Sequence, residues 1–297
     1  MADTLLNTQV LSTRRGRTKK ALDAITPFIL SLGVFIGVAT VASLLFTVLS
    51  NGYTRLSWNL IFEYPSPNPN QAGMRSAFLG SLWTVSLAAL ICVPLGICAA
   101  LYLTEWSRNK YVRRFFELNM ANLAGVPSIV FGLVGLSILT YGLGWGRSII
   151  AGAFTLATMT LPLVTVAAAE AIKTVPEALK LGAYALGATK LQVTRYIILP
   201  RAVPMMMTGA ILAISRAIGE AAPILVISGL LFIREDPTSI FDRFTVMPLQ
   251  IFNWVSRPQA AFQELSSAAI VVLLLMLLSL NSAAIAVRYR YQRRVTL

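Results

Sequence analysis

The chain has 297 residues, of which 56% are hydrophobic and only 12% are charged. Soluble domains carry about 25% charged residues, so the composition predicts a polytopic membrane protein rather than a soluble enzyme with a single anchor. The absence of histidine excludes histidine-based catalysis, histidine-ligated metals and histidine pH switches. Cys92 and Cys98 lie in one apolar run, where we expect packing residues rather than a disulfide, and no metal site.

Six apolar runs are close to or above the roughly 20 residues that a helix needs to cross a bilayer. They lie at residues 25–49, 77–103, 118–141, 148–169, 205–231 and 266–287, and the fourth is the weakest of them as a predicted span. The first run exceeds the apolar core of a cleaved signal peptide and no clear cleavage site follows it, so we expect it to stay in the mature protein. The sequence therefore predicts an all-α fold with about six transmembrane helices.

Lysine and arginine are distributed unevenly along this series of spans. The side that holds both tails carries 18 of them and the other side carries 6. The positive-inside rule then places both termini in the cytoplasm. We expect basic cytoplasmic tails at residues 1–24 and 288–297, the first of them mobile, around a transmembrane domain at 25–287. The excess of lysine and arginine on the predicted cytoplasmic side accounts for most of the net charge of +13, so we expect no nucleic-acid partner.

Two charged residues, Arg216 and Glu220, lie inside the fifth apolar run. Their four-residue spacing places them on one face of a helix, where they can pair. A charge at bilayer depth costs about 2.5–3.5 kcal/mol, which favours a polar pathway over a buried packing bridge. In the third run, Gly125-Val126-Pro127-Ser128 combines a small residue, a helix break and a hydroxyl, so we expect Ser128 to line the same pathway.

The predicted external segments are residues 50–76, 142–147 and 232–265. Each contains one tryptophan: Trp58, Trp145 and Trp254. This placement favours an aromatic belt at the membrane interface over a docking surface for an external partner.

The longest cytoplasmic connection, residues 173–204, predicts two short helices separated by Gly187. Capping-box spacing occurs at Thr174–Glu177 and again at Thr189–Gln192. Two prolines are expected to end the second helix before the fifth span, namely Pro200 and Pro204. The residues alone leave two interpretations open: an elbow that transmits force to the span carrying Arg216, or an ordinary amphipathic surface loop.

This connection resembles part of a known motif. Gly187, nine further residues and Ile197-Ile198-Leu199-Pro200 are similar to the second half of the EAA loop of ABC-transporter permeases. Segments 124–133 and 216–223 resemble phosphate-specific permeases. Segment 244–251, Asn253-Trp254 and Asn281 resemble the PstA-type subunit rather than its PstC-type partner.

The resemblance covers the chain from about residue 25 and implies the type I ABC importer permease fold in the bacterial cytoplasmic (inner) membrane. It implies one half of a heterodimeric pore for inorganic phosphate, formed with a PstC-type subunit and supplied by an external PstS-type binding protein. A PstB-type ATPase dimer would bind ATP and Mg²⁺, and this chain would hold no cofactor. The residues implied in coupling to the ATPase are Ala183, Gly187, Ile197, Leu199 and Pro200.

One departure from the family motif concerns the first half of the EAA loop. In register with Gly187, the positions of its Glu-Ala-Ala are occupied by Leu181-Gly182-Ala183. Glu177 lies four residues too early to replace the glutamate. Contacts that family members make through that side chain are therefore not expected here, whereas the apolar part of the docking surface is.

Other functions have less support in the sequence. Gly182 to Gly187 has the glycine spacing of a Walker A loop, but Ala188 replaces the required lysine and no strand precedes it, so ATP must be hydrolysed by another chain. A membrane enzyme acting on a phosphate ester would lack a nucleophile–base pair or a metal cluster. If the chain formed a channel, the elbow would have no function to perform. Arg216 offers fork-shaped donors to an oxyanion, but residue chemistry does not separate phosphate from sulfate or molybdate.

Overall fold

The computed structural model describes residues 2–229 and 232–295, and nearly all of this part of the chain is helical. The elements in chain order are α1 Ala2–Gly52, η1 Tyr53–Arg55, α2 Trp58–Phe62, α3 Arg75–Leu101, η2 Tyr102–Trp106, α4 Lys110–Ala124, α5 Ser128–Gly135, η3 Leu136–Gly142, α6 Ile149–Lys173, α7 Glu177–Ala185, α8 Lys190–Val193, η4 Thr194–Ile198, α9 Leu199–Gly219, α10 Ala222–Ser228, α11 Met247–Val255 and α12 Ala260–Val295. The predicted all-α class is confirmed.

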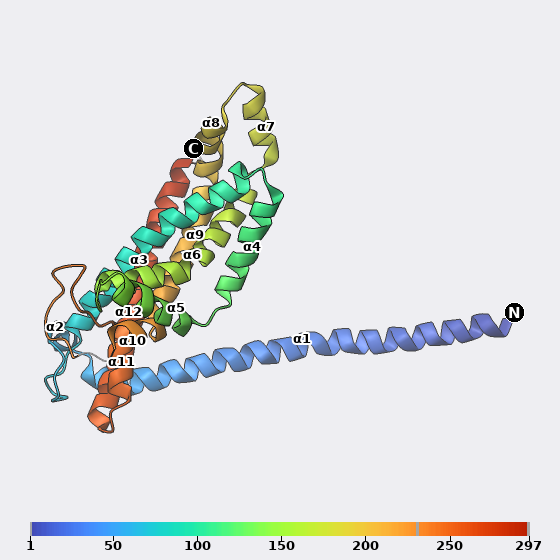
Figure 1. The fold of residues 1–297 in the computed structure, drawn as a ribbon. Helices are drawn as coiled ribbons and strands as arrows, with labels where there is room; N and C mark the ends of the chain where they lie inside the picture. Colours follow the sequence, from blue (N-terminus) through green and yellow to red (C-terminus); the bar gives the residue numbers. More distant parts are fainter. Residues whose placement is uncertain (1, 230–231, 296–297) are drawn as a thin grey trace.

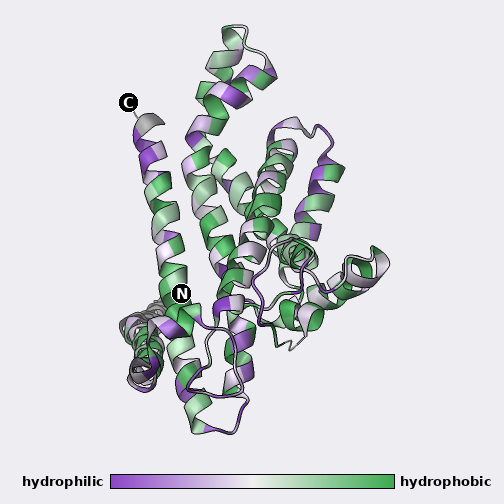
Figure 2. Ribbon diagram, turned by 90° about the vertical axis from the view of Figure 1, so that its left-hand side faces the viewer, coloured by the Kyte–Doolittle hydropathy of each residue, from purple (hydrophilic) through white to green (hydrophobic). Residues whose placement is uncertain are grey.

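Five helices are long and apolar enough to cross a membrane, and a bent pair supplies a sixth candidate. The five are Ile25–Arg55, Arg75–Trp106, Ile149–Lys173, Lys190–Gly219 and Ala260–Arg293. Figure 2 shows apolar residues along the shafts of the long helices and hydrophilic residues towards their ends. Figure 1 shows α7, α8 and the C-terminal end of α12 at one end of the bundle, with α2 and α11 at the other. This arrangement agrees with the predicted assignment of segments to two sides.

Helix α6 lies at the centre of the bundle, between α3 and α9. The sequence ranked this span as the weakest, yet 61% of its apolar window is buried, more than in any other of the five candidate spans. Small residues allow the close packing: a Cβ added at Gly209 of α9 would lie 2.3 Å from the Cβ of Ala167. Packing against neighbours, rather than length, therefore makes this helix central.

The expected span at 118–141 is sharply bent at the helix break that Pro127 indicates. The chain forms α4 and the α5–η3 helix, which meet at an angle of 101°. The reason is Pro127, which has no N–H to donate and adopts an extended conformation with ψ of 135°. The bend places Ser128 at the first position of α5.

The expected span at 205–231 is also interrupted. Helix α9 ends at Gly219, Glu220 is extended with φ −78° and ψ 110°, and α10 begins at Ala222. Pro223 causes the break, because it is tolerated in the first turn of a new helix but not in the interior of a continuous one.

The expectation that Pro200 and Pro204 end a helix is wrong, because one continuous helix runs from Lys190 to Gly219. A π-helical turn, η4, precedes Pro200, and in it the N–H of Leu199 donates to the carbonyl of Thr194, five residues back. This wider turn accommodates the proline ring next to a backbone that would otherwise clash. Helix α8, the second helix of the 173–204 connection, is therefore continuous with the fifth span.

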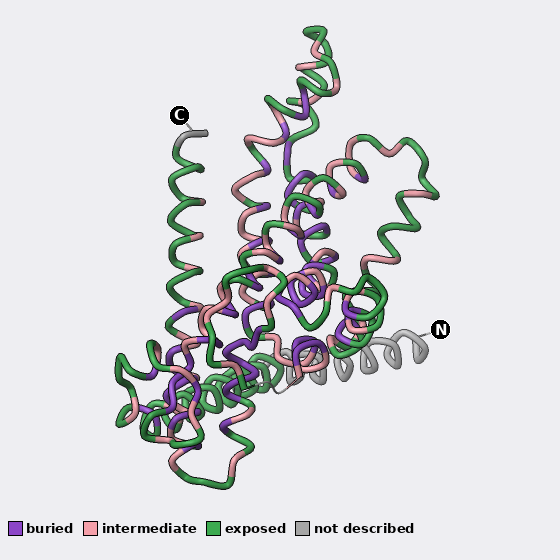
Figure 3. The backbone as a smooth tube through the Cα atoms, turned by 60° about the vertical axis from the view of Figure 1, so that its left-hand side comes forward, coloured by how far each residue is buried: buried purple, intermediate pink, exposed green. Residues whose placement is uncertain are grey.

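Helix α1 projects from the bundle as one continuous helix (Figure 1). The described side chains of its apolar part are almost all exposed, as Figure 3 shows. Near its C-terminal end the helix meets α12, where a Cβ on Gly52 would lie 2.7 Å from the backbone nitrogen of Ala268. Residues 2–24, expected as a mobile tail, continue this helix, and α12 likewise extends through the expected tail as far as Val295.

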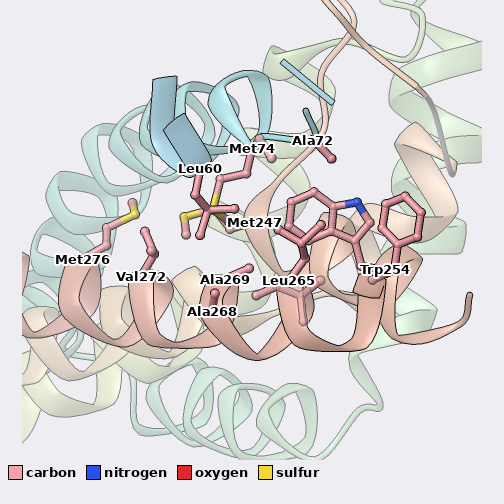
Figure 4. Packing of buried hydrophobic residues seen from close by; sticks show 13 residues of the cluster. Leu60, Ala72, Met74, Met247, Trp254, Leu265, Ala268, Ala269, Val272 and Met276 are labelled. Carbon is pink, nitrogen blue, oxygen red and sulfur yellow. The ribbon is translucent and has the colours of Figure 1, made fainter. Parts of the chain in front are cut away.

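The predicted external side has its own hydrophobic core, shown in Figure 4. Leu60 and Met74 from the 50–76 segment pack there with Met247, Trp254 and residues of α12. Trp254 is only 1% exposed, so the expectation of a membrane-belt role is wrong for this residue. Trp58, in contrast, is exposed.

The segment before α11 is buried between α3 and α6. The Phe244 ring lies against Gly152, and the N–H of Met247 donates to the Ser81 hydroxyl at 2.8 Å. Upstream of it, the carboxylate of Asp242 accepts hydrogen bonds from the backbone of Thr238 and Ser239, which lowers the pKa of that carboxyl. The external loop is thus anchored to the two most central helices.

Candidate functional site

The predicted pairing of Arg216 with Glu220 is present in the structure. Nε of Arg216 lies 3.2 Å from Oε1 of Glu220. Arg216 occupies the last turn of α9, where the negative end of the helix dipole favours a cation. Its side chain is 58% exposed, whereas that of Glu220 is 17% exposed. The guanidinium therefore has donors free for another anion, and the carboxylate is the more enclosed partner.

Arg216 and Ser128 line one small cavity. It has a volume of about 20 Å³ and lies between the α4–α5 bend, α6 and α9. Its lining residues are Leu123, Ala124, Val126, Ser128, Phe131, Met159, Thr160, Leu163 and Arg216. About 10–15 Å³ of such volume holds one water, so this conformation has no room for an oxyanion between these residues. The structure brings the two sequence-predicted residues together, but around a closed site.

The two backbone breaks adjoin each other, which sequence reasoning did not anticipate. Helix α5 packs against α10, and a Cβ added at Gly132 would lie 2.7 Å from the Cα of Pro223. Each break frees backbone polar groups, and in a membrane such groups persist only where protein or water meets them. Arg216 and Ser128 therefore lie in a region where two interrupted helices meet.

The connection at 173–204 forms the expected elbow. Gly187 has φ of +82°, a conformation that favours glycine, and it separates α7 from α8. The capping box at Thr189 and Gln192 is confirmed. The one expected at Thr174 is wrong, because its hydroxyl donates back to the carbonyl of Ala171 and Pro176 precedes α7.

A groove of about 370 Å³ lies on this elbow. Its lining residues are Ala183, Leu186, Gly187, Ala188, Gln192, Val193, Tyr196 and Ile197. Three of the predicted coupling residues are among them, whereas Leu199 packs on the adjacent apolar cluster and Pro200 lines a different cavity. Leu186 is 90% exposed, which is unusual for a leucine next to a groove.

Two contacts join the elbow to the end of α3. Lys180 of α7 forms an ion pair with Glu105, and the two side chains are only 18% and 13% exposed. Lys190 of α8 places its ammonium 5.2 Å from the centre of the Trp106 ring. Sequence reasoning missed both contacts, because nothing in the pattern of residues 105 and 106 links them to a segment some 75 positions later.

Within the residues that the structure describes, no group of three or more cysteine or acidic side chains could hold a metal ion. Cys92 and Cys98 are free thiols, the first buried and the second exposed.

The arrangement of interrupted membrane helices with a cytoplasmic elbow agrees with the family assignment obtained by comparison. Residues 92–297 match the family described as binding-protein-dependent transport system inner membrane component. The chain therefore belongs to this family of ABC-transporter permeases, and the resemblance noted in its sequence is confirmed.

Among its relatives is a probable ABC transporter permease protein, YqgI, of Bacillus subtilis (strain 168), which is 32% identical over 79% of this chain and 80% of the relative. Another is the phosphate transport system permease protein PstA of Mycobacterium leprae (strain TN), 33% identical over 84% of this chain and 83% of the relative. The crystal structure of an amino acid ABC transporter with histidines shares the fold, with a TM-score of 0.52 at 19% identity, covering 74% of this chain and 92% of that one.

Proposed function

We propose that this chain is the PstA-type permease subunit of an ATP-driven importer of inorganic phosphate. The main support is the similarity to PstA permeases over more than four-fifths of the chain. The site geometry is compatible with that role, because a largely exposed guanidinium at an interrupted helix can donate two parallel hydrogen bonds to a phosphate oxyanion. Glu220 would balance the charge of Arg216 when no anion is bound and so lower the cost of burial.

The proposed assembly contains a PstC-type permease, a PstB-type ATPase dimer and an external PstS-type binding protein in the bacterial cytoplasmic membrane. ATP and Mg²⁺ would be bound by the ATPase and not by this chain. Because the cavity between Arg216 and Ser128 is closed, phosphate would pass only after the α4–α5 bend and α9 move apart.

An uptake assay tests this function. The complete complex is reconstituted in proteoliposomes, and we expect ATP-dependent uptake of radiolabelled phosphate that excess unlabelled phosphate abolishes and equal sulfate or molybdate leaves nearly unchanged. If sulfate or molybdate competed as well as phosphate, the assigned substrate would be wrong. Release of phosphate from an ester by the permeases without their ATPase would instead support a membrane enzyme.

The elbow groove is the proposed docking surface for the ATPase, with Leu186 as its apolar anchor. Burying a fully exposed leucine contributes about 1.5–3 kcal/mol, so Leu186→Asp should weaken ATPase binding by at least about tenfold. Leu186→Met conserves volume and should bind normally, which controls for changes in expression and insertion. The measurement is the amount of ATPase that co-purifies with the permeases, and normal recovery with the aspartate variant would rule out this docking surface.

A further inference from the structure

A second cavity lies between α9 and α12, at the ends of these helices that are predicted to be cytoplasmic. It has a volume of about 490 Å³, which is within the range of about 300–1,000 Å³ typical of small-molecule sites. Its lining residues are Pro200, Arg201, Pro204, Met205, Thr208, Arg288 and Gln292. None of them contributes to the cavity of Arg216 or to the elbow groove.

The two arginines of this cavity have no carboxylate partner among the described residues. Arg288 donates from Nη1 to the Thr208 hydroxyl at 2.7 Å, but its Nε is buried and forms no hydrogen bond in the described part of the chain. Arg201, within the described ranges 2–229 and 232–295, donates to the backbone carbonyl of Ile197 at 3.3 Å. Neither 178–219 nor 265–297, the stretches that contain these residues, has a single Asp or Glu.

A buried donor without an acceptor is costly, and two guanidinium groups beside one cavity repel each other. An anion between them would remove both costs. Arginine pairs especially well with phosphate oxygens, since its planar donors match their geometry. Besides the polar Thr208 and Gln292, the rest of the lining comes from Pro200, Pro204 and the partly exposed Met205, and this apolar part suits a ligand that carries a hydrocarbon chain.

We propose that this cavity binds the phosphate diester headgroup of an anionic phospholipid, held by Arg201 and Arg288. Basic cavities between transmembrane helices on the cytoplasmic side are suited to such headgroups. A phospholipid headgroup and a free phosphate ion both present a tetrahedral oxyanion to the two arginines. The apolar part of the lining favours the lipid, because a free phosphate ion would leave the surface of Pro200, Pro204 and Met205 in contact with water.

The proposed lipid would bridge two helices that matter to transport. Helix α9 leads from the elbow to Arg216, and α12 contacts it again at Asn281, whose Oδ1 accepts a hydrogen bond from the Ser215 hydroxyl at 2.5 Å. A headgroup between the helix ends would fix their spacing on the elbow side. The consequence for transport rests on the proposed function, whereas the binding itself does not.

Binding is tested on the purified complex by native mass spectrometry, with phosphatidylglycerol, phosphatidylcholine and inorganic phosphate as separate probes. The variant is R201Q/R288Q. The matched control is R290Q/R293Q, which removes two arginines from the end of α12 that do not line the cavity. If each cavity arginine contributes about one kcal/mol through its hydrogen bond to the headgroup, the first variant should bind phosphatidylglycerol about thirtyfold more weakly, and the control, whose arginines make no such bond, should bind it normally.

Three results would overturn the proposal: normal phosphatidylglycerol binding by R201Q/R288Q, an equal loss in both variants, or equal binding of phosphatidylcholine. If inorganic phosphate displaced phosphatidylglycerol and its binding required the same two arginines, the ligand of this cavity would be the free ion and not the lipid. R201K/R288K, which keeps both charges, should recover much of the binding and so separates a direct contact from misfolding. Since none of these measurements requires uptake, they remain decisive even if the transported substrate is not phosphate.

Discussion

Substituting Arg216 by glutamine should reduce ATP-driven phosphate uptake by tenfold or more, with the complex still assembled. The reason is twofold: a hydrogen bond between charged groups contributes about 1.5–3 kcal/mol, and Glu220 loses the cation that compensates its charge. Arg216→Lys retains the charge without the planar fork, so intermediate uptake is expected. The measurement is initial uptake in proteoliposomes.

The control for this experiment is Arg290→Gln, which removes an exposed arginine at the end of α12. A double variant, Arg216→Gln with Glu220→Gln, removes the unbalanced carboxylate and should keep yield and assembly normal without restoring uptake. Wild-type uptake by Arg216→Gln would show that the residue is a packing bridge and not part of the pathway.

Reversing the charge of Lys180 or Glu105 should uncouple ATP hydrolysis from transport. Both side chains are largely enclosed, so a single reversal places two like charges in contact, and breaking such a pair typically costs about 3–5 kcal/mol. Phosphate-stimulated ATPase activity and uptake should both fall by at least about tenfold in Lys180→Glu and in Glu105→Lys. The swapped double variant re-forms the pair and should recover most of the activity.

Lys173 and Glu170 provide the matched comparison. They also form an ion pair close to the elbow, but their side chains are 53% and 58% exposed. Exposed pairs contribute at most about 1 kcal/mol, so Lys173→Glu should change coupling little. If the Lys180–Glu105 swap failed to recover activity, or if Lys173→Glu were equally damaging, the pair would not have a specific role in holding the elbow.

Composition and local pattern were sufficient to predict the all-α class, the approximate number of spans, the capping box at Thr189 and the pairing of Arg216 with Glu220. These features depend on hydropathy and on contacts within one helical turn. The family resemblance added the expected role of the elbow in coupling to the ATPase, and the comparisons confirmed the family.

The errors share a physical origin. Proline chemistry indicated a break at Pro127, but hydropathy gave neither its angle of 101° nor the interruption of the fifth run at Glu220. The usual effect of proline predicted that a helix ends at Pro200. The structure instead has a π-helical turn before this residue, which keeps the helix continuous. The tertiary contact between Lys180 and Glu105 has no local signature, because it is created only when α7 folds back towards α3.

The continuity of the helix from Lys190 to Gly219 has a mechanical consequence. At about 1.5 Å per residue, some 39 Å separate Lys190 from Arg216 along one rod, with the proposed ATPase-docking elbow at one end and the guanidinium proposed to bind the anion at the other. Such a rod acts as a lever: a tilt of about ten degrees around its middle moves each end by roughly 3 Å, in opposite directions. A displacement of about 3 Å is comparable to the width of a water molecule. At the Arg216 end of the helix, it would change the size of a cavity of about 20 Å³.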